Sequence, residues 1–149
     1  MLEPSASLWL HPNERRTLAR QLQGAAIREV MRAPAGGDLQ EKWWELALQT
    51  APELDDASWI LSVLRREIRI PGLPLDQELR WQLLEAWSRV PSHDAENFRA
   101  ALEAEARRDP SETGQNWMTS IYAANASPEA KQAAFERALS SETTFSDLR

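Results

Sequence analysis

The sequence has 149 residues, of which 42% are hydrophobic and 27% are charged, as is ordinary for one globular domain and unlike a disordered chain. Its net charge is −6, from 23 acidic and 17 basic residues. The basic residues are dispersed among Asp and Glu, whereas a nucleic-acid binder needs a concentrated basic face, so we expect no nucleic-acid partner.

The chain has no Cys, which excludes disulfides and thiolate chemistry. No apolar run approaches the roughly 20 residues that cross a bilayer. Residues 1–10 lack the basic start and the apolar stretch of a signal peptide. We therefore expect no membrane partner and a cytoplasmic location.

The first helix is predicted to begin at His11-Pro12-Asn13-Glu14, because Pro is tolerated where the first amide has no partner within the helix. It should end before Pro34-Ala35-Gly36-Gly37, which is a loop signal. Helical spacing predicts that its inward face consists of Leu18, Leu22, Ala25, Ala26 and Val30.

Asp38 is predicted to cap a second helix, which Pro52 ends. Trp43 and Trp44 lie about 100° apart on a helix, so they cannot both point into one narrow row. Either both indoles pack at the edges of a broad core face, or one is half exposed and belongs to a partner surface. The buried row is either Trp43, Ala47 and Thr50 or Trp44, Leu48 and Ala51.

A third helix is predicted over residues 54–68, with a buried row of Ala57, Ile60, Leu61, Leu64 and Ile68. Residues 71–74 (Pro-Gly-Leu-Pro) interrupt the helical pattern. Asp76 is then predicted to cap a fourth helix that ends at Pro91 and buries Leu79, Leu83, Ala86, Trp87 and Val90.

Trp81 lies on the flank of this fourth helix, beside Arg80. It is expected to pack either against residues 70–74 or against a neighbouring helix.

Ser92 or Asp94 is predicted to start a fifth helix that buries Phe98, Ala101, Leu102 and Ala106. Residues 109–112 (Asp-Pro-Ser-Glu) match a capping box with Asp109 as the cap, Pro at the first helical position and Glu at the third. The sixth helix would bury Trp117, Ile121 and Ala124, and a seventh from Ser127-Pro128-Glu129 would bury Ala130, Ala134, Phe135, Ala138 and Leu139. Residues 143–149 read as the opening of a further element.

These elements predict an all-α fold, because helices this short gain their stability by stacking their apolar faces. We expect antiparallel helical hairpins stacked as an α-α superhelix of the HEAT or armadillo kind, in one helical-repeat domain over residues 1–149 with a poorly structured start at 1–10. The spacing of the repeats is irregular, so a compact irregular bundle is the alternative.

The residue pattern predicts no reaction centre. His11 and His93 have no His or Glu at ligand spacing, His-Glu-x-x-His is absent, and both should act at helix starts as caps or in solvent. No Gly-x-Ser-x-Gly motif surrounds any Ser, so a serine nucleophile is not indicated. Gly36-Gly37 follows no predicted strand and so does not indicate a phosphate-binding loop. The paired carboxylates Asp55-Asp56 lie at a predicted helix start, where they would complement the helix dipole. We therefore expect no catalytic, cofactor-binding or metal-binding residue on this chain.

Two stretches resemble the C-terminal helical domain of aminopeptidase N-type zinc metallopeptidases, especially the actinobacterial kind, over roughly residues 39–148. From Pro71 the chain reads PGLPLDQELRWQLLEAW, and the similar positions are Asp76, Leu79, Arg80, Trp81, Leu83 and Leu84. From Arg107 it reads RRDPSETGQNWMTSIYAANASPEAKQAAFERAL, and the similar positions are Asp109, Pro110, Gly114, Ala123, Pro128, Lys131 and Phe135.

The resemblance implies a structural role. In that family, which includes the endoplasmic-reticulum aminopeptidases, this domain is a helical-repeat bowl that closes over the catalytic domain, encloses the substrate chamber and can contact the peptide away from its N-terminus. Zinc, the Gly-x-Met-x-Asn loop and the catalytic Glu belong to other domains and match no position here. The family's domain is about twice as long, so the chain looks like a portion of it.

The sequence therefore favours a noncatalytic helical segment of a zinc aminopeptidase that shapes the peptide chamber and its opening and closing. Its expected partners are the catalytic domain of the parent enzyme, the peptide substrate and, through an uncovered end of the solenoid, a second copy. The alternative is a free-standing helical-repeat module that binds a peptide or a partner helix. An independent small enzyme is the least favoured hypothesis.

Overall fold

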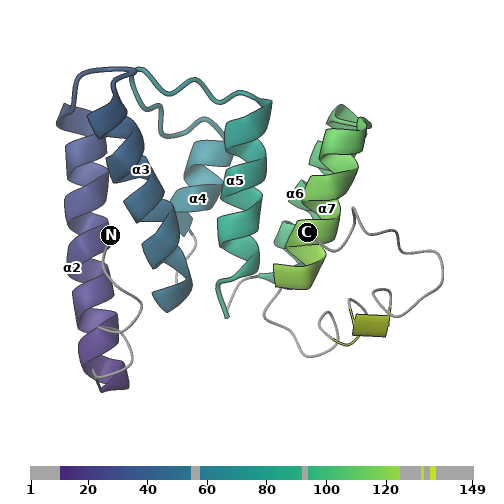
Figure 1. Cartoon of the computed structure of the whole chain (residues 1–149), viewed down its shortest axis with the longest axis horizontal. Coiled ribbons are helices and arrows are strands. Elements are labelled where there is room, and N and C mark those ends of the chain that lie inside the picture. Colours follow the sequence, from purple (N-terminus) through teal and green to yellow (C-terminus); the bar gives the residue numbers. More distant parts are fainter. Residues whose placement is uncertain (1–10, 55–57, 92–93, 125–131, 133–134, 137–149) are drawn as a thin grey trace.

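The computed structural model describes residues 11–54, 58–91, 94–124, 132, 135 and 136 (Figure 1). Within this part the fold is all-helical and contains no strand. The elements are α2 (Pro12–Arg32), α3 (Asp38–Thr50), the short 3-10 helix η1 (Ala51–Glu53), α4 (Ser58–Leu64), α5 (Gln77–Ser88), α6 (Ala95–Arg108) and α7 (Glu112–Ala124). None of the described helices combines the length and the apolar character needed to cross a membrane.

In the view of Figure 1, α2, α3, α5 and α7 follow one another across the molecule, with α4 and α6 behind them. α2 packs along α3, to which residues 33–37 connect it, and α5 contacts α3, η1 and α4 on one side and α6 and α7 on the other. α5 is therefore the central helix that joins the first half of the described chain to the second.

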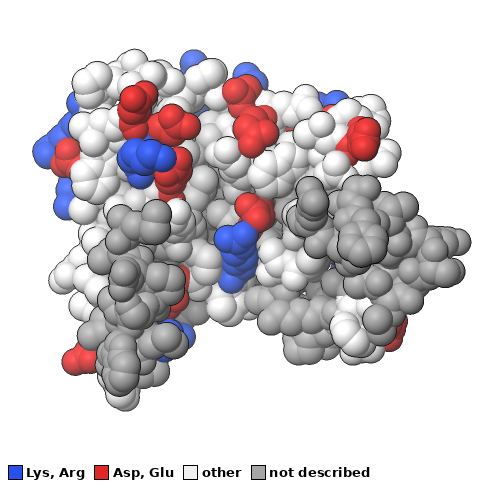
Figure 2. All heavy atoms as spheres, in the orientation of Figure 1, with Lys and Arg blue, Asp and Glu red and all other residues white. Residues whose placement is uncertain are grey.

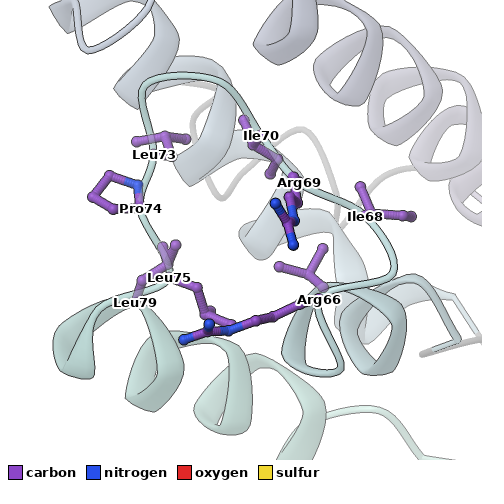
Figure 3. Close-up of a pocket in the computed structure, with 9 residues that line it drawn as sticks. Arg66, Ile68, Arg69, Ile70, Leu73, Pro74, Leu75 and Leu79 are labelled. Carbon is purple, nitrogen blue, oxygen red and sulfur yellow. The ribbon is translucent and has the colours of Figure 1, made fainter.

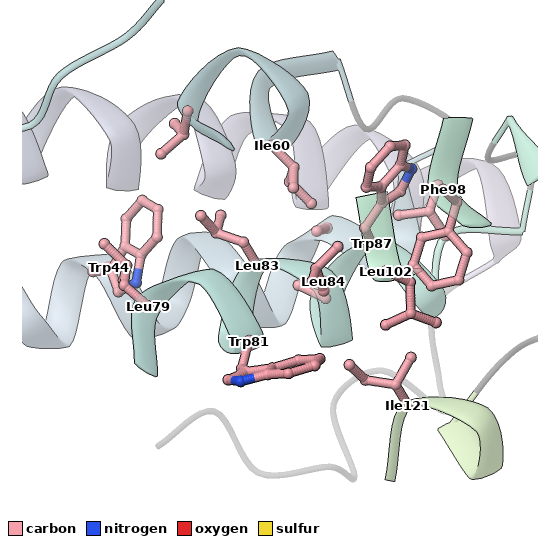
Figure 4. Close-up of a cluster of buried hydrophobic side chains, with 14 of the residues drawn as sticks. Trp44, Ile60, Leu79, Trp81, Leu83, Leu84, Trp87, Phe98, Leu102 and Ile121 are labelled. Atoms are coloured by element: carbon pink, nitrogen blue, oxygen red, sulfur yellow. The ribbon is translucent and has the colours of Figure 1, made fainter. Parts of the chain in front are cut away.

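The core is built around α5, which is buried on both faces (Figure 4). The side chain of Asp76 accepts a hydrogen bond from the Leu79 amide at 2.9 Å and caps the helix as predicted. The predicted inward residues Leu79, Leu83, Ala86, Trp87 and Val90 are all buried. Trp81 and Leu84 are buried as well, because α6 and α7 cover the flank that one stripe of apolar residues would have left open.

The inward face of α2 differs from the predicted one. Ala26 and Val30 are buried as expected, but Leu18 is 41% exposed, and Ala19 and Gln23 are buried in its place. The observed buried row is Ala19, Gln23, Ala26 and Val30, so the prediction, which followed the bulkiest apolar residues, was displaced by one position only in the first half of the helix.

The second helix begins one residue earlier than predicted. Gly37 precedes α3, and Asp38 is its first residue rather than its cap. Neither predicted buried row is right as a whole, since Trp44, Ala47, Thr50 and Ala51 are all buried. Trp43 is half-buried, so the two indoles do divide into a core residue and an edge residue.

The third helix is much shorter than the predicted 54–68. α4 covers only Ser58–Leu64, and Ile68, predicted to be inward, is 43% exposed. Ile60 is buried as predicted, Leu61 and Leu64 are half-buried, and Ala57 lies outside the described residues. The helix ends because Arg66 adopts a left-handed conformation (φ 62), although neither Gly nor Pro marks this position in the sequence.

Asp94 caps α6 and accepts hydrogen bonds from the amides of Glu96 and Asn97. Of the two predicted starts of this helix, Ser92 and Asp94, the second is therefore confirmed. The capping box at 109–112 was placed two residues early. Ser111 directly precedes α7, and its hydroxyl accepts from the Gly114 amide at 3.2 Å, so Ser111 fills the cap position predicted for Asp109. Asp109 instead accepts from the Ser111 hydroxyl.

Of the predicted inward residues in these two helices, Phe98, Leu102 and Ile121 are buried. Ala101, Ala106, Trp117 and Ala124 are half-buried. Phe135, predicted to face inward, is 61% exposed. The predictions for residues 1–10, Ser92, 127–131 and 143–149 lie outside the described residues.

A buried polar network joins α5 to α6 and α7. The Trp81 indole donates to the Asp109 carboxylate at 2.9 Å, and the Arg80 guanidinium donates to the fully buried Glu105 at 2.5 Å. At Gly114 a Cβ atom would collide with the Asp109 backbone and carboxylate, so only Gly allows α7 to start this close. We call Arg80, Trp81, Glu105 and Asp109 the α5–α7 joint.

Candidate functional site

The candidate site lies over the end of α4, where the chain forms a Schellman motif. The Glu67 amide donates to the Ser62 carbonyl and the Arg66 amide to the Val63 carbonyl, which is the hydrogen-bond pair of that motif. Arg66 has φ 62, a left-handed conformation that Gly normally supplies at this position. A non-Gly residue there is strained by about 1 kcal/mol or more, so the side chain of Arg66 merits a functional explanation.

The chain then reverses direction in a tight turn. The Leu73 amide donates to the Ile70 carbonyl at 3.2 Å, with Pro71 and Gly72 as the two central residues. Gly72 has φ 82, which together with the preceding Pro is typical of a type II turn. Residues 65–76, which we call the α4–α5 segment, are thus ordered without regular secondary structure.

The turn is fixed to the α2–α3 connection by a buried glutamine. The Gln40 side chain donates to the carbonyls of Val30 at 2.8 Å and Pro71 at 2.7 Å, and it accepts from the Gly36 amide at 2.8 Å. Gly72 also lies directly against Gly36, where a Cβ atom would collide with backbone. Because three chain segments meet at one side chain, the α4–α5 segment is held in place.

The α4–α5 segment encloses a pocket of about 400 Å³ against α4 and α5 (Figure 3). Pockets of this size are within the range that binds small molecules or peptide groups. Seven of the nine lining side chains are apolar, and the other two are the guanidinium-bearing side chains of Arg66 and Arg69, which extend along the pocket in Figure 3. The full lining is Val63, Arg66, Ile68, Arg69, Ile70, Leu73, Pro74, Leu75 and Leu79.

The pocket is locally cationic in an acidic protein. Asp and Glu are absent from its lining, and the side chains of Arg66 and Arg69 make no ion pair or hydrogen bond with any described residue. On the face in Figure 2, by contrast, Lys and Arg lie beside Asp and Glu. Guanidinium groups bind carboxylates and phosphates in a forked geometry, so the pocket suits an anionic group with an apolar neighbour.

Sequence reasoning missed this site. Arg66 was counted among dispersed basic residues, and Arg69 was not singled out. The signal available was two arginines that flank an Ile and lead into Pro-Gly, in the stretch RREIRIPGLP. That signal is weak, because the pocket depends on the early end of α4 and on the contact between Gly72 and Gly36.

Other residues weighed for chemistry have structural surroundings where they are described. His11 caps α2: its ring accepts from the Asn13 amide at 3.4 Å, and Glu14 accepts from the His11 amide at 3.2 Å. This confirms the predicted capping role of His11, while His93 and Asp55-Asp56 lie outside the described residues. In the described part of the chain, no three His, Cys, Asp or Glu side chains gather in a group that could hold a metal ion.

The acidity of the Asp109 carboxyl is altered. Hydrogen bonds from the Ser111 hydroxyl and then from the Trp81 indole stabilise its charged form and lower its pKa below the usual value. Because it has only internal partners and is 5% exposed, this carboxylate belongs to the α5–α7 joint and not to the pocket.

Comparisons with known proteins do not assign this site. The chain matches no model of a known protein family, and no curated protein matches its sequence.

Proposed function

We propose that this chain is a noncatalytic helical segment of a zinc-dependent aminopeptidase, where it shapes the peptide chamber and takes part in its opening and closing. The observation that carries the proposal is the cationic, mostly apolar pocket beside Arg66 and Arg69. An extended peptide presents such a combination at its C-terminus, where a carboxylate follows an apolar side chain. As the resemblance implies, the zinc would be held by another domain of the parent enzyme. The composition, without Cys, favours the cytoplasm as its location.

The order of the helices supports a superhelical arrangement within this proposal. In a solenoid each unit contacts its neighbours in sequence. Here α2 packs chiefly on α3 and η1, and α5 connects α3 and α4 to α6 and α7. Stacked in this way, the helices would place the α4–α5 segment on one surface of the peptide chamber.

The alternative is a free-standing interaction module that binds the same kind of peptide without a catalytic partner. The genomic sequence upstream of Met1 distinguishes the two. A His-Glu-x-x-His motif in the same reading frame supports the aminopeptidase, and a stop codon directly upstream supports the free-standing module.

Peptide binding is tested by calorimetric titration of the chain with a hexapeptide that ends in Leu, as the free acid and as the C-terminal amide. We expect the free acid to bind about tenfold more tightly, since a hydrogen bond to a charged group contributes about 1.5 kcal/mol or more. Arg66→Gln with Arg69→Gln should abolish this difference.

Arg65→Gln is the matched control, because Arg65 is exposed and does not line the pocket. It should keep the preference for the free acid. Equal binding of acid and amide by the parent chain, or loss of the preference in Arg65→Gln alone, would contradict the proposal.

A further inference from the structure

The outer wall of the candidate pocket is not held by burial of its own side chains. The wall is the loop of residues 69–75, which curves around the pocket in Figure 3, and every residue of this loop is exposed or half-buried. Its apolar lining residues are Ile70, Leu73, Pro74 and Leu75. Because none of them is fully buried, the position of the wall depends on contacts that the loop makes with the rest of the chain.

A buried side chain outside the pocket supplies such a contact. Gln40 belongs to α3, is 1% exposed and does not line the pocket. Its side-chain amide donates to the Pro71 carbonyl at 2.7 Å. In the described part of the chain, this hydrogen bond joins the loop to an element distant in sequence, whereas the other backbone bonds of residues 69–75 run between residues close in sequence.

Gln40 is itself fixed by the end of α2. The Val30 carbonyl lies in the last turn of that helix, and the residue four positions further on is Pro34, which has no amide hydrogen to donate. The Gln40 side chain replaces this missing donor at 2.8 Å, and its oxygen accepts from the Gly36 amide at 2.8 Å. The position of Pro71 is therefore set by the α2–α3 connection.

We propose that Gln40 is a positioning residue of the candidate pocket: by holding Pro71, it keeps the apolar wall in contact with the side chain of the bound peptide's last residue. The inference rests on the proposed function, in which a peptide C-terminus occupies the pocket. Arg66 is held separately, because its amide donates to the Val63 carbonyl at the end of α4. Gln40 therefore governs the preference for an apolar side chain and leaves the preference for a carboxylate to the arginines.

Loss of the bond from Gln40 would let the wall move outward. Pro71 is exposed, so its carbonyl can accept a hydrogen bond from water when Gln40 no longer donates. Dispersion attraction falls steeply with distance, and a gap of about 1 Å removes roughly half of the energy of a contact. A released wall would thus bind a large apolar side chain little better than a small one.

The test compares two free-acid hexapeptides, one ending in Leu and one in Ala, by calorimetric titration of the full chain. We expect the parent to bind the Leu peptide about tenfold more tightly, because burial of the additional carbon atoms favours binding. Gln40→Met keeps nearly the same size but cannot donate a hydrogen bond. It should reduce this ratio to about threefold and should keep the preference for the free acid over the amide.

Thr50→Val is the matched control, because it removes another buried polar group from the opposite end of α3. The Thr50 hydroxyl donates to the carbonyls of Leu46 and Ala47 and not to the loop. The variant should keep the tenfold ratio, so a reduced ratio in both variants would overturn the inference.

The outcomes separate this inference from the proposed function. An unchanged ratio in Gln40→Met, or loss of both preferences together, would overturn the inference while the parent chain still binds the peptide. No binding of the Leu peptide by the parent chain would contradict the proposed function and the inference with it.

A measurement on the parent chain decides the matter if Gln40→Met does not fold. The side-chain amide signals of Gln40 in a ¹⁵N spectrum should shift when the Leu peptide saturates the chain. They should stay close to their original positions with the Ala peptide, because only the longer side chain reaches the wall. Signals that stay in place with both peptides, or that shift equally with both, would overturn the inference.

Discussion

The α5–α7 joint and the α4–α5 segment lie on opposite sides of α5 and treat their polar groups differently. At the joint, Trp81 and Arg80 each have a carboxylate partner, and Trp81, Glu105 and Asp109 are buried. Around the α4–α5 segment, Arg66 and Arg69 line the pocket and have no partner among the described residues. The buried Oε1 atom of Glu105 has no partner among the described residues, but the donors of the joint are paired. Paired donors fix a structure, whereas unpaired donors beside a pocket are available to a ligand.

The largest effect is expected from Trp81→Ala at the joint. The substitution removes a fully buried indole and leaves Asp109 without that donor, so the free energy of unfolding should fall by about 3–5 kcal/mol. Denaturant unfolding followed by circular dichroism measures the loss. Trp43→Ala, at a half-buried indole, should cost clearly less; equal losses would mean that the joint is no more important than the edge of the core.

A smaller loss is expected from Gly72→Ala, which tests whether the α4–α5 segment is held in place. A methyl group at φ 82 would collide with the backbone of Ala35 and Gly36, so we expect a loss of about 2 kcal/mol. Gly24→Ala is the control: it lies inside α2, where the new methyl meets only an ordinary contact, and it should stabilise the protein by about 0.5–1 kcal/mol. An unchanged free energy of unfolding in Gly72→Ala would show that the α4–α5 segment can shift to accommodate the methyl group and is not held in place.

The joint also predicts a pH dependence. Because the pKa of Asp109 is lower in the folded protein than in the unfolded chain, its contribution is fully present above the unfolded value and is lost as the pH falls below about 4. The free energy of unfolding, measured between pH 6 and pH 2.5, should fall less steeply toward acid pH in Asp109→Asn than in the parent chain. Identical slopes would contradict the role assigned to this carboxylate.

The smallest change in stability is expected from Arg66→Gly. Glycine relieves the left-handed strain but adds freedom to the unfolded chain, so the free energy of unfolding should stay within about 1 kcal/mol of the parent and should not fall. The preference for the free-acid peptide should nevertheless weaken. A variant that unfolds more readily would show that the Arg66 side chain is retained for stability rather than for binding.

The starts of helices were predicted well from capping residues, because a cap acts on amides within one turn of the helix. Asp76, Asp94 and His11 cap the helices that their positions indicated. The face of α5 was predicted correctly, whereas its second buried face was not, because the contact with α6 and α7 leaves no periodic trace. Tertiary contacts also determine that Ala19 rather than Leu18 is buried in the α2 interface. They determine the cap of α7 as well, because Asp109 accepts a hydrogen bond from Trp81 and Ser111 takes the cap position.

The candidate site was harder to predict than the fold. Its pocket depends on a helix that ends without Gly or Pro, at a left-handed Arg66, and on a glutamine that joins segments 31 residues apart. No pattern in a single sequence separates Arg66 and Arg69 from solvated arginines.

The difference between the two sides of α5 is tested most directly by the arginine Nε–H resonances in a ¹⁵N spectrum, recorded while the free-acid hexapeptide is added. The signals of Arg66 and Arg69 should shift with a common saturation curve, whereas that of Arg80, which is paired with Glu105, should stay in place. A shift confined to Arg80, or none at Arg66 and Arg69 while the peptide binds, would contradict the account.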